Sequence, residues 1–269
     1  MREIEACIGR ENMKLNFVIS AEILTAVSLG LFLWSLCHPV FAGEQENFPQ
    51  HVELVWSESD GLRHEIYASS YLSGRWSEPR QITDDNADNL HPAVDIDADG
   101  RKWVVWTAID ETGYEIKYTI FEHGEWMEPT VLPSSLRSNI KPSVALDAKN
   151  IPWVVWSGND GDNDDIYFSR FINGKWEKER RVHEGNKVPD ILPVVNLNTD
   201  GKLTIVWEGY RNGAYHKLQS SWNGKYWNTP IELTGENELS EQSEKNEASL
   251  PLPEYVNDQR QVFLRIYEK

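Results

Sequence analysis

The chain has 269 residues, a formal net charge of −17 at pH 7, and 12 Trp, 10 Tyr, 17 Gly and 13 Pro. This abundance of aromatic and turn-forming residues favours many short strands over a few long helices. The negative charge argues against binding to nucleic acid or to an anionic membrane surface, and leaves a neutral sugar, a cation or a basic protein patch as partners.

An apolar segment near the N-terminus predicts export. The run 23–37 is uncharged, follows Lys14 and precedes Val40-Phe41-Ala42, a small-residue cleavage pattern. We therefore expect residues 1–42 to be a secretory signal, with Met13 as an alternative start, and the mature protein to be periplasmic or extracellular.

The alternative is an uncleaved membrane anchor, since residues 15–37 are long enough to span a bilayer. Both cysteines, Cys7 and Cys37, lie in this segment, so we expect no disulfide in the mature domain. Residues 43–51 read as a short linker and residues 52–269 as one domain.

Two series of tryptophans reveal an internal repeat of roughly 50 residues. The first comprises Trp56, Trp106, Trp156 and Trp207, spaced by 50, 50 and 51 residues. The second comprises Trp76, Trp126, Trp176 and Trp227, with the same spacings and each close behind a glycine. We expect all eight to pack between repeats rather than to stack on sugars.

Each complete copy of the repeat predicts four strands, most clearly in the second copy at 93–97, 103–107, 114–121 and 126–132. Asp99-Gly100 and Asp200-Gly201 give tight turns between the first and second strands. A four-stranded antiparallel unit that repeats in this way is typical of a β-propeller blade. The sequence therefore predicts an all-β fold, a small propeller of four to five blades.

The two ends of the domain carry incomplete copies. The first begins at its second strand, 52–56, and the last stops after two strands within 253–267, which makes 17 strands in all. The first strand of the last copy either pairs with the second strand of the first copy and closes a ring of four blades, or the ring has five blades with the last unfinished. Between them, residues 234–249 are rich in Glu, Ser and Asn, and we expect an acidic mobile loop.

The repeat resembles known propeller families. His91-Pro92-Ala93-Val94, followed by Val104-Val105-Trp106 and Gly124-Glu125-Trp126, resembles the repeats of the sialidase-like, or Asp-box, superfamily. Asp165-Ile166-Tyr167-Phe168-Ser169 is similar to TolB-type repeats. The resemblance implies the fold more than an activity, because propellers host enzymes and binding modules alike.

The residues that sialidases use are not recognisable in this chain. The nearest stretch to their Ser-x-Asp-x-Gly-x-Thr-Trp box, residues 97–103, has Asp and Gly at another spacing. The arginines of the mature chain do not recur at strand starts, where the family's arginine triad would converge. We therefore expect no sialidase activity.

One stretch matches the opening of a calcium loop. Asp95, Asp97 and Asp99 precede Gly100 in the pattern Asp-x-Asp-x-Asp-Gly, which supplies oxygen ligands. Alternating polar residues on a strand that ends in a hairpin explain the same pattern. Apart from this calcium ion, we expect no cofactor.

The loops between the second and third strands form the predicted binding face, because loops on a rigid scaffold commonly carry function. In the third of these loops, residues 160–165 are acidic and would suit a cation or a basic partner, or simply solvent. At the start of the third strand, an acidic residue recurs every 50 residues, either as a carboxylate ring or as acceptors for the backbone. The candidate ligand-binding residues are Asp60, His64, Glu65, His91, Tyr114, Glu115, Lys141, Asp164 and Asp165.

Three functions follow. The first is an exported, non-catalytic module that recognises a glycan or a protein, because no catalytic set is recognisable. The second is a glycoside hydrolase or lyase of the sialidase-like superfamily that uses two of the carboxylates just named. The third is a structural envelope protein that associates with itself through its incomplete terminal blades.

Overall fold

The computed structural model describes residues 51–59, 61–234 and 261–267, all of them strands, turns or loops. For His51 and residues 261–267, only the backbone is described. None of these ranges contains a helix with the length and apolar character needed to cross a membrane. The predicted signal, the predicted linker as far as residue 50, Asp60, and residues 235–249 of the predicted acidic loop lie outside the described residues.

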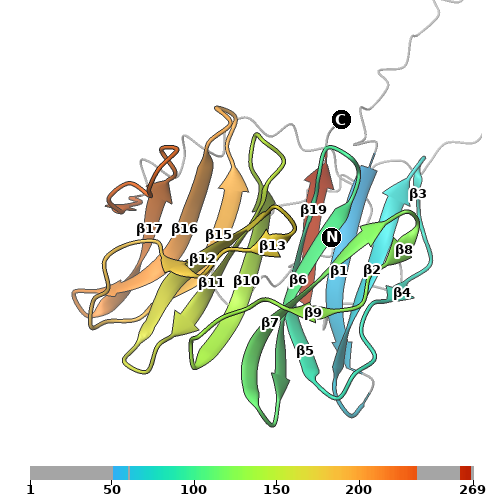
Figure 1. Cartoon of the computed structure of the whole chain (residues 1–269), viewed down its shortest axis with the longest axis horizontal. Coiled ribbons are helices and arrows are strands. Elements are labelled where there is room, and N and C mark those ends of the chain that lie inside the picture. Colours follow the sequence, from blue (N-terminus) through green and yellow to red (C-terminus); the bar gives the residue numbers. More distant parts are fainter. Residues whose placement is uncertain (1–50, 60, 235–260, 268–269) are drawn as a thin grey trace, which may run out of the picture.

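The strands follow the predicted repeat, and we group them into units 1 to 4 (Figure 1). Unit 1 contains β1 (His51–Ser59), β2 (His64–Leu72), β3 (Arg75–Trp76) and β4 (Arg80–Gln81). Unit 2 contains β5 (Asp88–Ile96), β6 (Lys102–Asp110), β7 (Gly113–Glu122), β8 (Glu125–Trp126) and β9 (Thr130–Val131). Unit 3 contains β10 (Ser138–Leu146), β11 (Pro152–Asn159), β12 (Asp164–Ile172), β13 (Lys175–Trp176) and β14 (Arg180–Arg181). Unit 4 contains β15 (Asp190–Leu197), β16 (Leu203–Arg211), β17 (Ala214–Ser221) and β18 (Ile231–Glu232), and β19 (Gln261–Tyr267) follows.

The fourth strand of the repeat differs from the prediction. In unit 2 it is not one strand over 126–132 but two short strands, β8 and β9, which both pair with β7. Pro129 lies between them and has no N–H to continue the ladder. Similar splitting in units 1 and 3 brings the described strands to nineteen, so the predicted count of 17 is wrong.

The first three strands of each unit form an antiparallel sheet. A single parallel pair, Ser138 with Tyr114, joins the sheets of units 2 and 3. In unit 1, β19 pairs antiparallel with β1 from Ser57↔Gln261 to His51↔Tyr267. The last copy therefore does pair with the first copy, but through its second predicted strand rather than its first. The first predicted strand, within 253–260, lies outside the described residues.

The core lies between neighbouring units, in the propeller-like manner that the repeat predicts. The first tryptophan series is fully buried. Between units 3 and 4, Trp153 and Phe168 pack against Val195, Trp207 and Trp227. Of the second series, Trp176 and Trp227 are buried, whereas Trp76 and Trp126 are partly exposed. Six tryptophans of the two series lie in clusters that combine two neighbouring units, as predicted: Trp106, Trp126, Trp156, Trp176, Trp207 and Trp227. Trp76 instead packs on Val52 and Tyr71 of its own unit.

The first strand of units 2, 3 and 4 carries the same backbone irregularity. His91, Lys141 and Leu192 have φ of 53°, 55° and 57°, and the strand register shifts at each of them. A proline follows each residue and has no N–H for the ladder, so the strand bulges there. A bulge redirects its side chain, and two of the three residues are the predicted candidates His91 and Lys141.

Candidate functional site

The loops between the second and third strands and the connections between units lie at one end of the fold, which we call the loop face. Asn139 Nδ2, at the start of β10, donates to Tyr114 O at 3.4 Å. Asn163 Nδ2, in the β11–β12 loop, donates to Val188 O at 2.9 Å, just before β15. These contacts tie the predicted binding loops to the segments that connect the units.

The third strand of the repeat is β2 in unit 1, β7 in unit 2, β12 in unit 3 and β17 in unit 4. Near its start, each of these strands presents one residue on the loop face: His64, Tyr114, Asp164 and Tyr215. Tyr114 and Tyr215 are 46% and 45% exposed, which is unusual for large aromatic side chains in this fold. His64 Nδ1 lies 2.8 Å from Asp88 Oδ1, and Asp164 Oδ1 accepts from Asn159 Nδ2 at 2.9 Å. Three of these four residues were predicted; Tyr215 was missed as a ligand candidate, although the repeat spacing points to it.

His91 and Lys141 lie on the first strands of units 2 and 3, and both side chains are half-buried. Burial, reinforced by the charge of Lys141, lowers the pKa of His91 to about 4. Burial also lowers the pKa of Lys141. His91 Nδ1 is buried without a hydrogen-bond partner among the described residues. The imidazole of His91, neutral at neutral pH, thus lies near the Lys141 amine.

The recurring acids Glu65, Glu115 and Asp165 have three different environments. Glu65 is buried and accepts hydrogen bonds from Thr83 Oγ1 at 2.5 Å and Asn89 Nδ2 at 3.3 Å. Glu115 is half-buried, and Asp165 is buried. Glu65 therefore acts as an acceptor, the second of the two predicted roles, and Thr83 and Asn89 donate to it through their side chains.

Asp165 belongs to a buried cluster that also contains His183, from the β14–β15 connection, and Asp190, the first residue of β15. His183 Nε2 lies 3.3 Å from Asp190 Oδ2, and His183 Nδ1 lies 2.7 Å from Glu184 O. The imidazole stacks on Trp207 with ring centroids 5.5 Å apart. We call these three residues the junction cluster, because they join unit 3 to unit 4.

The charges of the junction cluster act on one another. Burial raises the pKa of Asp165. Burial alone would lower the pKa of His183, but the Asp190 carboxylate and the Glu184 carbonyl outweigh it and raise that pKa. Burial would likewise raise the pKa of Asp190, but the adjacent His183 imidazole and a hydrogen bond from Asn186 hold it below its usual value. Both the raised pKa of His183 and the lowered pKa of Asp190 mean that the cluster stabilises positive charge next to the Asp190 carboxylate. Burial disfavours the ionised form of the neighbouring Asp165 carboxyl.

Two arginines approach the junction cluster from its rim. Arg211 Nη2 donates to Asp190 Oδ1 at 2.9 Å. Arg181 Nε lies 3.2 Å from Asp165 Oδ2 but donates its single N–H to Tyr167 Oη at 2.9 Å, and Arg181 Nη2 pairs with Asp160. Neither oxygen of Asp165 has a hydrogen-bond partner among the described residues.

Sequence reasoning identified Asp165 but missed His183 and Asp190. The signal that could have found them is the repeat itself. At the junction of units 1 and 2, the corresponding positions are Thr83 and Asn89, both neutral. At the junction of units 3 and 4, an imidazole and a carboxylate replace them. A change from neutral to charged residues at buried positions of a repeat requires a physical reason.

The predicted calcium ligands have protein donors. Asp97 accepts hydrogen bonds from the backbone of Asp99 and Arg101, from Arg101 Nε at 2.6 Å and from Trp103 Nε1 at 3.3 Å. Asp95 Oδ2 accepts from the backbone N–H of Leu146 at 2.9 Å. These contacts cap the turn and join units 2 and 3; calcium binding here stays a prediction and would compete with them.

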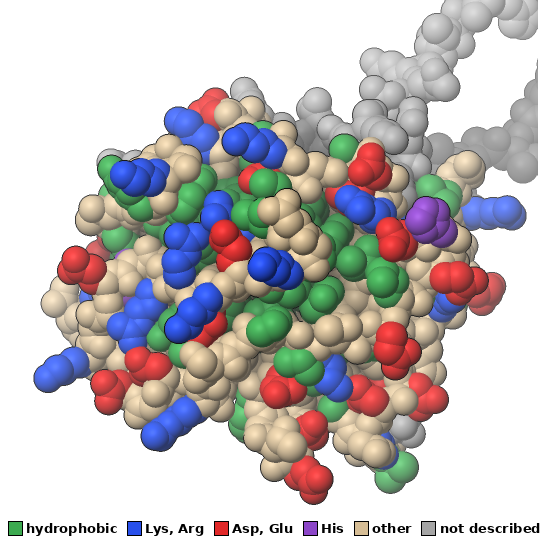
Figure 2. Space-filling model, in the orientation of Figure 1, with side chains coloured by type: hydrophobic (Ala, Val, Ile, Leu, Met, Phe, Trp, Pro, Cys, Tyr) green, Lys and Arg blue, Asp and Glu red, His purple; other side chains and the backbone are tan. Residues whose placement is uncertain are grey.

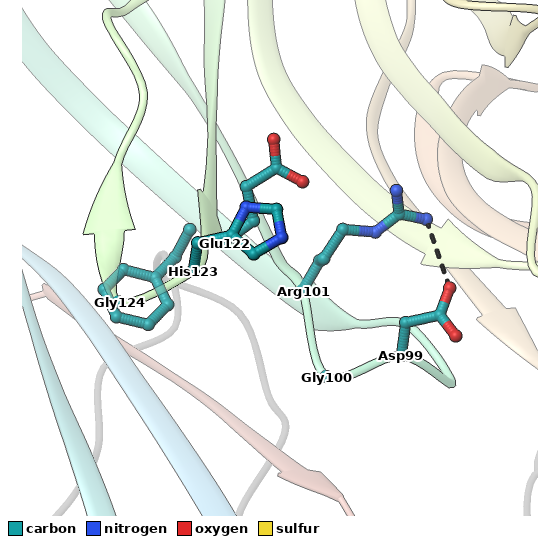
Figure 3. Close-up of a pocket in the computed structure, with 7 residues that line it drawn as sticks. Asp99, Gly100, Arg101, Glu122, His123 and Gly124 are labelled. Carbon is teal, nitrogen blue, oxygen red and sulfur yellow. Dashed lines mark ion pairs between the residues drawn. The ribbon is translucent and has the colours of Figure 1, made fainter.

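Asp99 lines a recess at the opposite end of the fold (Figure 3). The recess lies between the β5–β6 and β7–β8 turns, and Arg101 and Glu122 extend from these turns in the close-up. Arg101 Nη2 lies 3.6 Å from Asp99 Oδ2. Turn residues with their own ion pair form this recess, and it lies away from the loop face.

Lys and Arg side chains gather on the left of the face shown in Figure 2, although the chain is strongly acidic. In unit 3, Arg170 Nε lies 2.6 Å from Glu177 Oε2, and Arg180 Nη2 lies 3.6 Å from the same oxygen. Arg181 pairs with Asp160 and Asp165. Because carboxylates offset these arginines, they do not form an obvious site for an anion.

No protein-family model matches the chain, and no curated protein sequence matches it. Among solved structures, it is similar to a protein of unknown function from Dyadobacter fermentans, with 14% identity, 66% of this chain and 55% of that chain covered, and a TM-score of 0.50. It is also similar to an endo-arabinase from Bacteroides thetaiotaomicron, with 15% identity, 69% and 77% covered, and a TM-score of 0.49. The chain thus spans about half the length of the first of these structures. Likeness at such low identity bears on the fold alone.

Proposed function

We propose that this protein is an exported, non-catalytic β-propeller module that binds a glycan on its loop face. The observation that carries this proposal is the pair of exposed tyrosines, Tyr114 and Tyr215, at one repeat position shared with His64 and Asp164. The face of a phenol ring packs on the C–H surface of a sugar, while imidazole and carboxylate groups bond to its hydroxyls. These four residues therefore supply both kinds of contact at one end of the fold.

His91 and Lys141 add polar groups on the first strands of units 2 and 3. A neutral imidazole both donates and accepts a hydrogen bond, and an ammonium only donates. Sugar hydroxyls match this combination because each hydroxyl both donates and accepts. The bulges that position the two residues are built into the strands, so the groups are held in place before a ligand arrives.

The positions of the carboxylates support binding over hydrolysis. A glycoside hydrolase needs two carboxyl groups about 5 to 10 Å apart that both reach the substrate. Glu65 and Asp165 are buried beneath the loop face, and among the described candidates only Glu115 and Asp164 are partly exposed. A hydrolase that uses these two carboxylates is the alternative, and it predicts turnover that either Glu115→Gln or Asp164→Asn abolishes.

We further propose that the ring has four blades, with the first completed by β19. The pairing of β19 with β1 supports this arrangement over an unfinished fifth blade, because it supplies the strand that the first copy lacks. It also removes one of the incomplete edges on which the structural, self-associating alternative depends.

The proposal is tested by screening residues 43–269 on a glycan array, with and without calcium. Saturable binding to a defined sugar is the expected result, and dependence on calcium would add a role for Asp95, Asp97 and Asp99. An array that stays blank under both conditions contradicts glycan binding and points to a protein ligand or a structural role.

A further inference from the structure

We infer that the junction cluster, Asp165, His183 and Asp190, is a binding site for a divalent transition-metal ion, with Zn²⁺ as the ion that best suits its donors. One nitrogen or oxygen from each residue lies within 4.8 Å of the other two. The 3.3 Å between His183 Nε2 and Asp190 Oδ2 is about the separation of two ligands on one tetrahedral zinc ion with bonds near 2.0 to 2.1 Å. The site does not depend on the proposed glycan binding.

The tautomer of His183 makes the case for a cation. Glu184 O can only accept, so the hydrogen bond of 2.7 Å places a proton on His183 Nδ1. In the neutral ring, Nε2 then points its lone pair at the Asp190 carboxylate. Metal-binding histidines have this same arrangement, with the distal nitrogen bonded to a backbone carbonyl.

Three buried acceptor atoms of two side chains converge here, and none of them receives a hydrogen bond from the described residues. His183 Nε2 and both oxygens of Asp165 lack hydrogen-bond partners among the described residues. Asp165 is 1% exposed and Asp190 is 0% exposed, so water does not compensate from the outside. Unpaired buried acceptors are costly, and a cation among them would satisfy all three at once.

Contacts around the cluster hold its ligands in position. Asp190 Oδ1 accepts from Trp207 Nε1 at 3.1 Å and from Arg211, and Asp190 Oδ2 accepts from Asn186 Nδ2 at 2.6 Å. The ring of His183 lies flat on Trp207. Such outer contacts fix ligand orientation in metal sites and reduce the freedom lost on binding.

The charge of the cluster leaves room for a cation. With a neutral imidazole, the carboxylates of Asp160, Asp165 and Asp190 and the guanidiniums of Arg181 and Arg211 sum to one net negative charge. The imidazole ligand favours zinc and its neighbours over calcium or magnesium, which prefer oxygen ligands. A second proton on His183, at Nε2, would supply the same positive charge and therefore competes with the metal ion for this site.

The first junction in the chain shows what this position needs when no cation is available. There, Glu65 accepts from Thr83 and Asn89, so neutral donors satisfy the carboxylate. The junction of units 3 and 4 has lost both donors and gained two acceptors at the same positions. His183→Thr and Asp190→Asn restore the residues of the first junction, and both variants are therefore expected to fold.

The test uses the full domain after removal of bound metal with a chelator. Zn²⁺ affinity and stoichiometry are measured by competition with a chromogenic chelator, and the melting temperature is measured with and without Zn²⁺. His216→Gln is the matched control: His216 Nδ1 also pairs with a carboxylate, Glu232, at 2.7 Å, but outside the cluster. Co²⁺ added in place of Zn²⁺ reports tetrahedral coordination through its visible absorption.

We expect one Zn²⁺ per wild-type chain, a melting temperature that rises with Zn²⁺ by mass action, and affinity weaker by about 100-fold in His183→Thr and in Asp190→Asn. His216→Gln should bind as the wild type does. Equal zinc retention by wild type and both cluster variants overturns the proposal. So does a wild type that binds no zinc but loses stability as pH rises, which would identify the second proton as the occupant.

Discussion

Trp156 Nε1 donates a hydrogen bond of 2.8 Å to Asn139 Oδ1, which joins the buried second strand of unit 3 to the start of its first strand. The same bond recurs at 2.7 Å between Trp106 and Asn89. In unit 4, Trp207 donates to Asp190 at 3.1 Å. Trp106, Trp156 and Trp207 are therefore both packing elements and anchors for the loop face. Trp56, the remaining member of the first series, donates instead to Glu58 on its own strand at 3.1 Å.

We expect Asn139→Leu to lower the free energy of unfolding by about 2 kcal/mol, because it leaves the buried indole N–H of Trp156 without an acceptor. Urea denaturation followed by tryptophan fluorescence measures the loss. The double variant Asn139→Leu/Trp156→Phe removes both partners and should recover part of the stability. If the single variant is as stable as wild type, the bond does not anchor the loop face.

Trp153 should be among the most costly core residues to truncate. It stacks on Phe168 with centroids 5.6 Å apart and meets Trp222 and Trp227 edge-on. Trp153→Ala is expected to cost about 3 to 5 kcal/mol by leaving a cavity between units 3 and 4. Tyr226→Ala, at an exposed side chain in the last turn of unit 4, should change stability by no more than about 0.5 kcal/mol. Similar losses in the two variants would argue against a core between units.

Sequence alone predicted the features that recur with a fixed period. The spacing of Trp56, Trp106, Trp156 and Trp207 gave their burial, because a position repeated in every sheet meets the same neighbour each time. It did not give the positive φ of His91 and Lys141, since the residue before a proline is usually extended. Here the ladder has to bypass Pro92 and Pro142, and a bulge at the preceding residue is how it does so.

The candidate site was only half predictable for a related reason. Rim residues such as His64 and Tyr114 follow from the repeat, because each starts the same strand. The junction cluster does not, because His183 and Asp190 lie 18 and 25 residues after Asp165, and His183 comes from the β14–β15 connection, which has no regular pairing. His183 and Asp190 stand out because they replace Thr83 and Asn89 of the first junction. Recognising this replacement requires both an alignment of the repeats and the contacts seen in the structure.

Acid should destabilise the protein partly through His91. Its pKa is about 4 in the folded state, against the 6.5 of an ordinary histidine in the unfolded chain. Between these values the unfolded chain takes up a proton that the folded chain does not, so the free energy of unfolding falls as pH drops through this window. We expect His91 to account for about 2 kcal/mol of that loss, after allowance for its partial exposure.

His91→Asn is the matched variant, since asparagine accepts the positive φ at this position. Urea denaturation of both proteins at pH 7 and pH 4 checks the prediction, with the stability of the variant falling less than that of wild type. Parallel losses in the two proteins would show that His91 is not held neutral by burial.

The β1–β19 pairing should control association. A chain that ends at residue 260 leaves one edge of β1 without a partner strand among those described, and an exposed strand edge pairs with other chains. We expect this chain to form dimers or larger species in size-exclusion chromatography with light scattering. A chain that ends at residue 267 keeps β19 and should elute as the full protein does. If both shortened chains remain monomeric, β19 does not complete unit 1.

The most direct test of glycan binding on the loop face is isothermal titration of the best array ligand into wild type and into Tyr114→Ala/Tyr215→Ala. Stacking of the sugar on the two exposed rings should contribute about 1 kcal/mol or more to the binding free energy. The double variant is therefore expected to bind about 10-fold more weakly, with an unchanged melting temperature. An unchanged Kd in the double variant would contradict the account, because the ligand would then bind away from the rim that these tyrosines form.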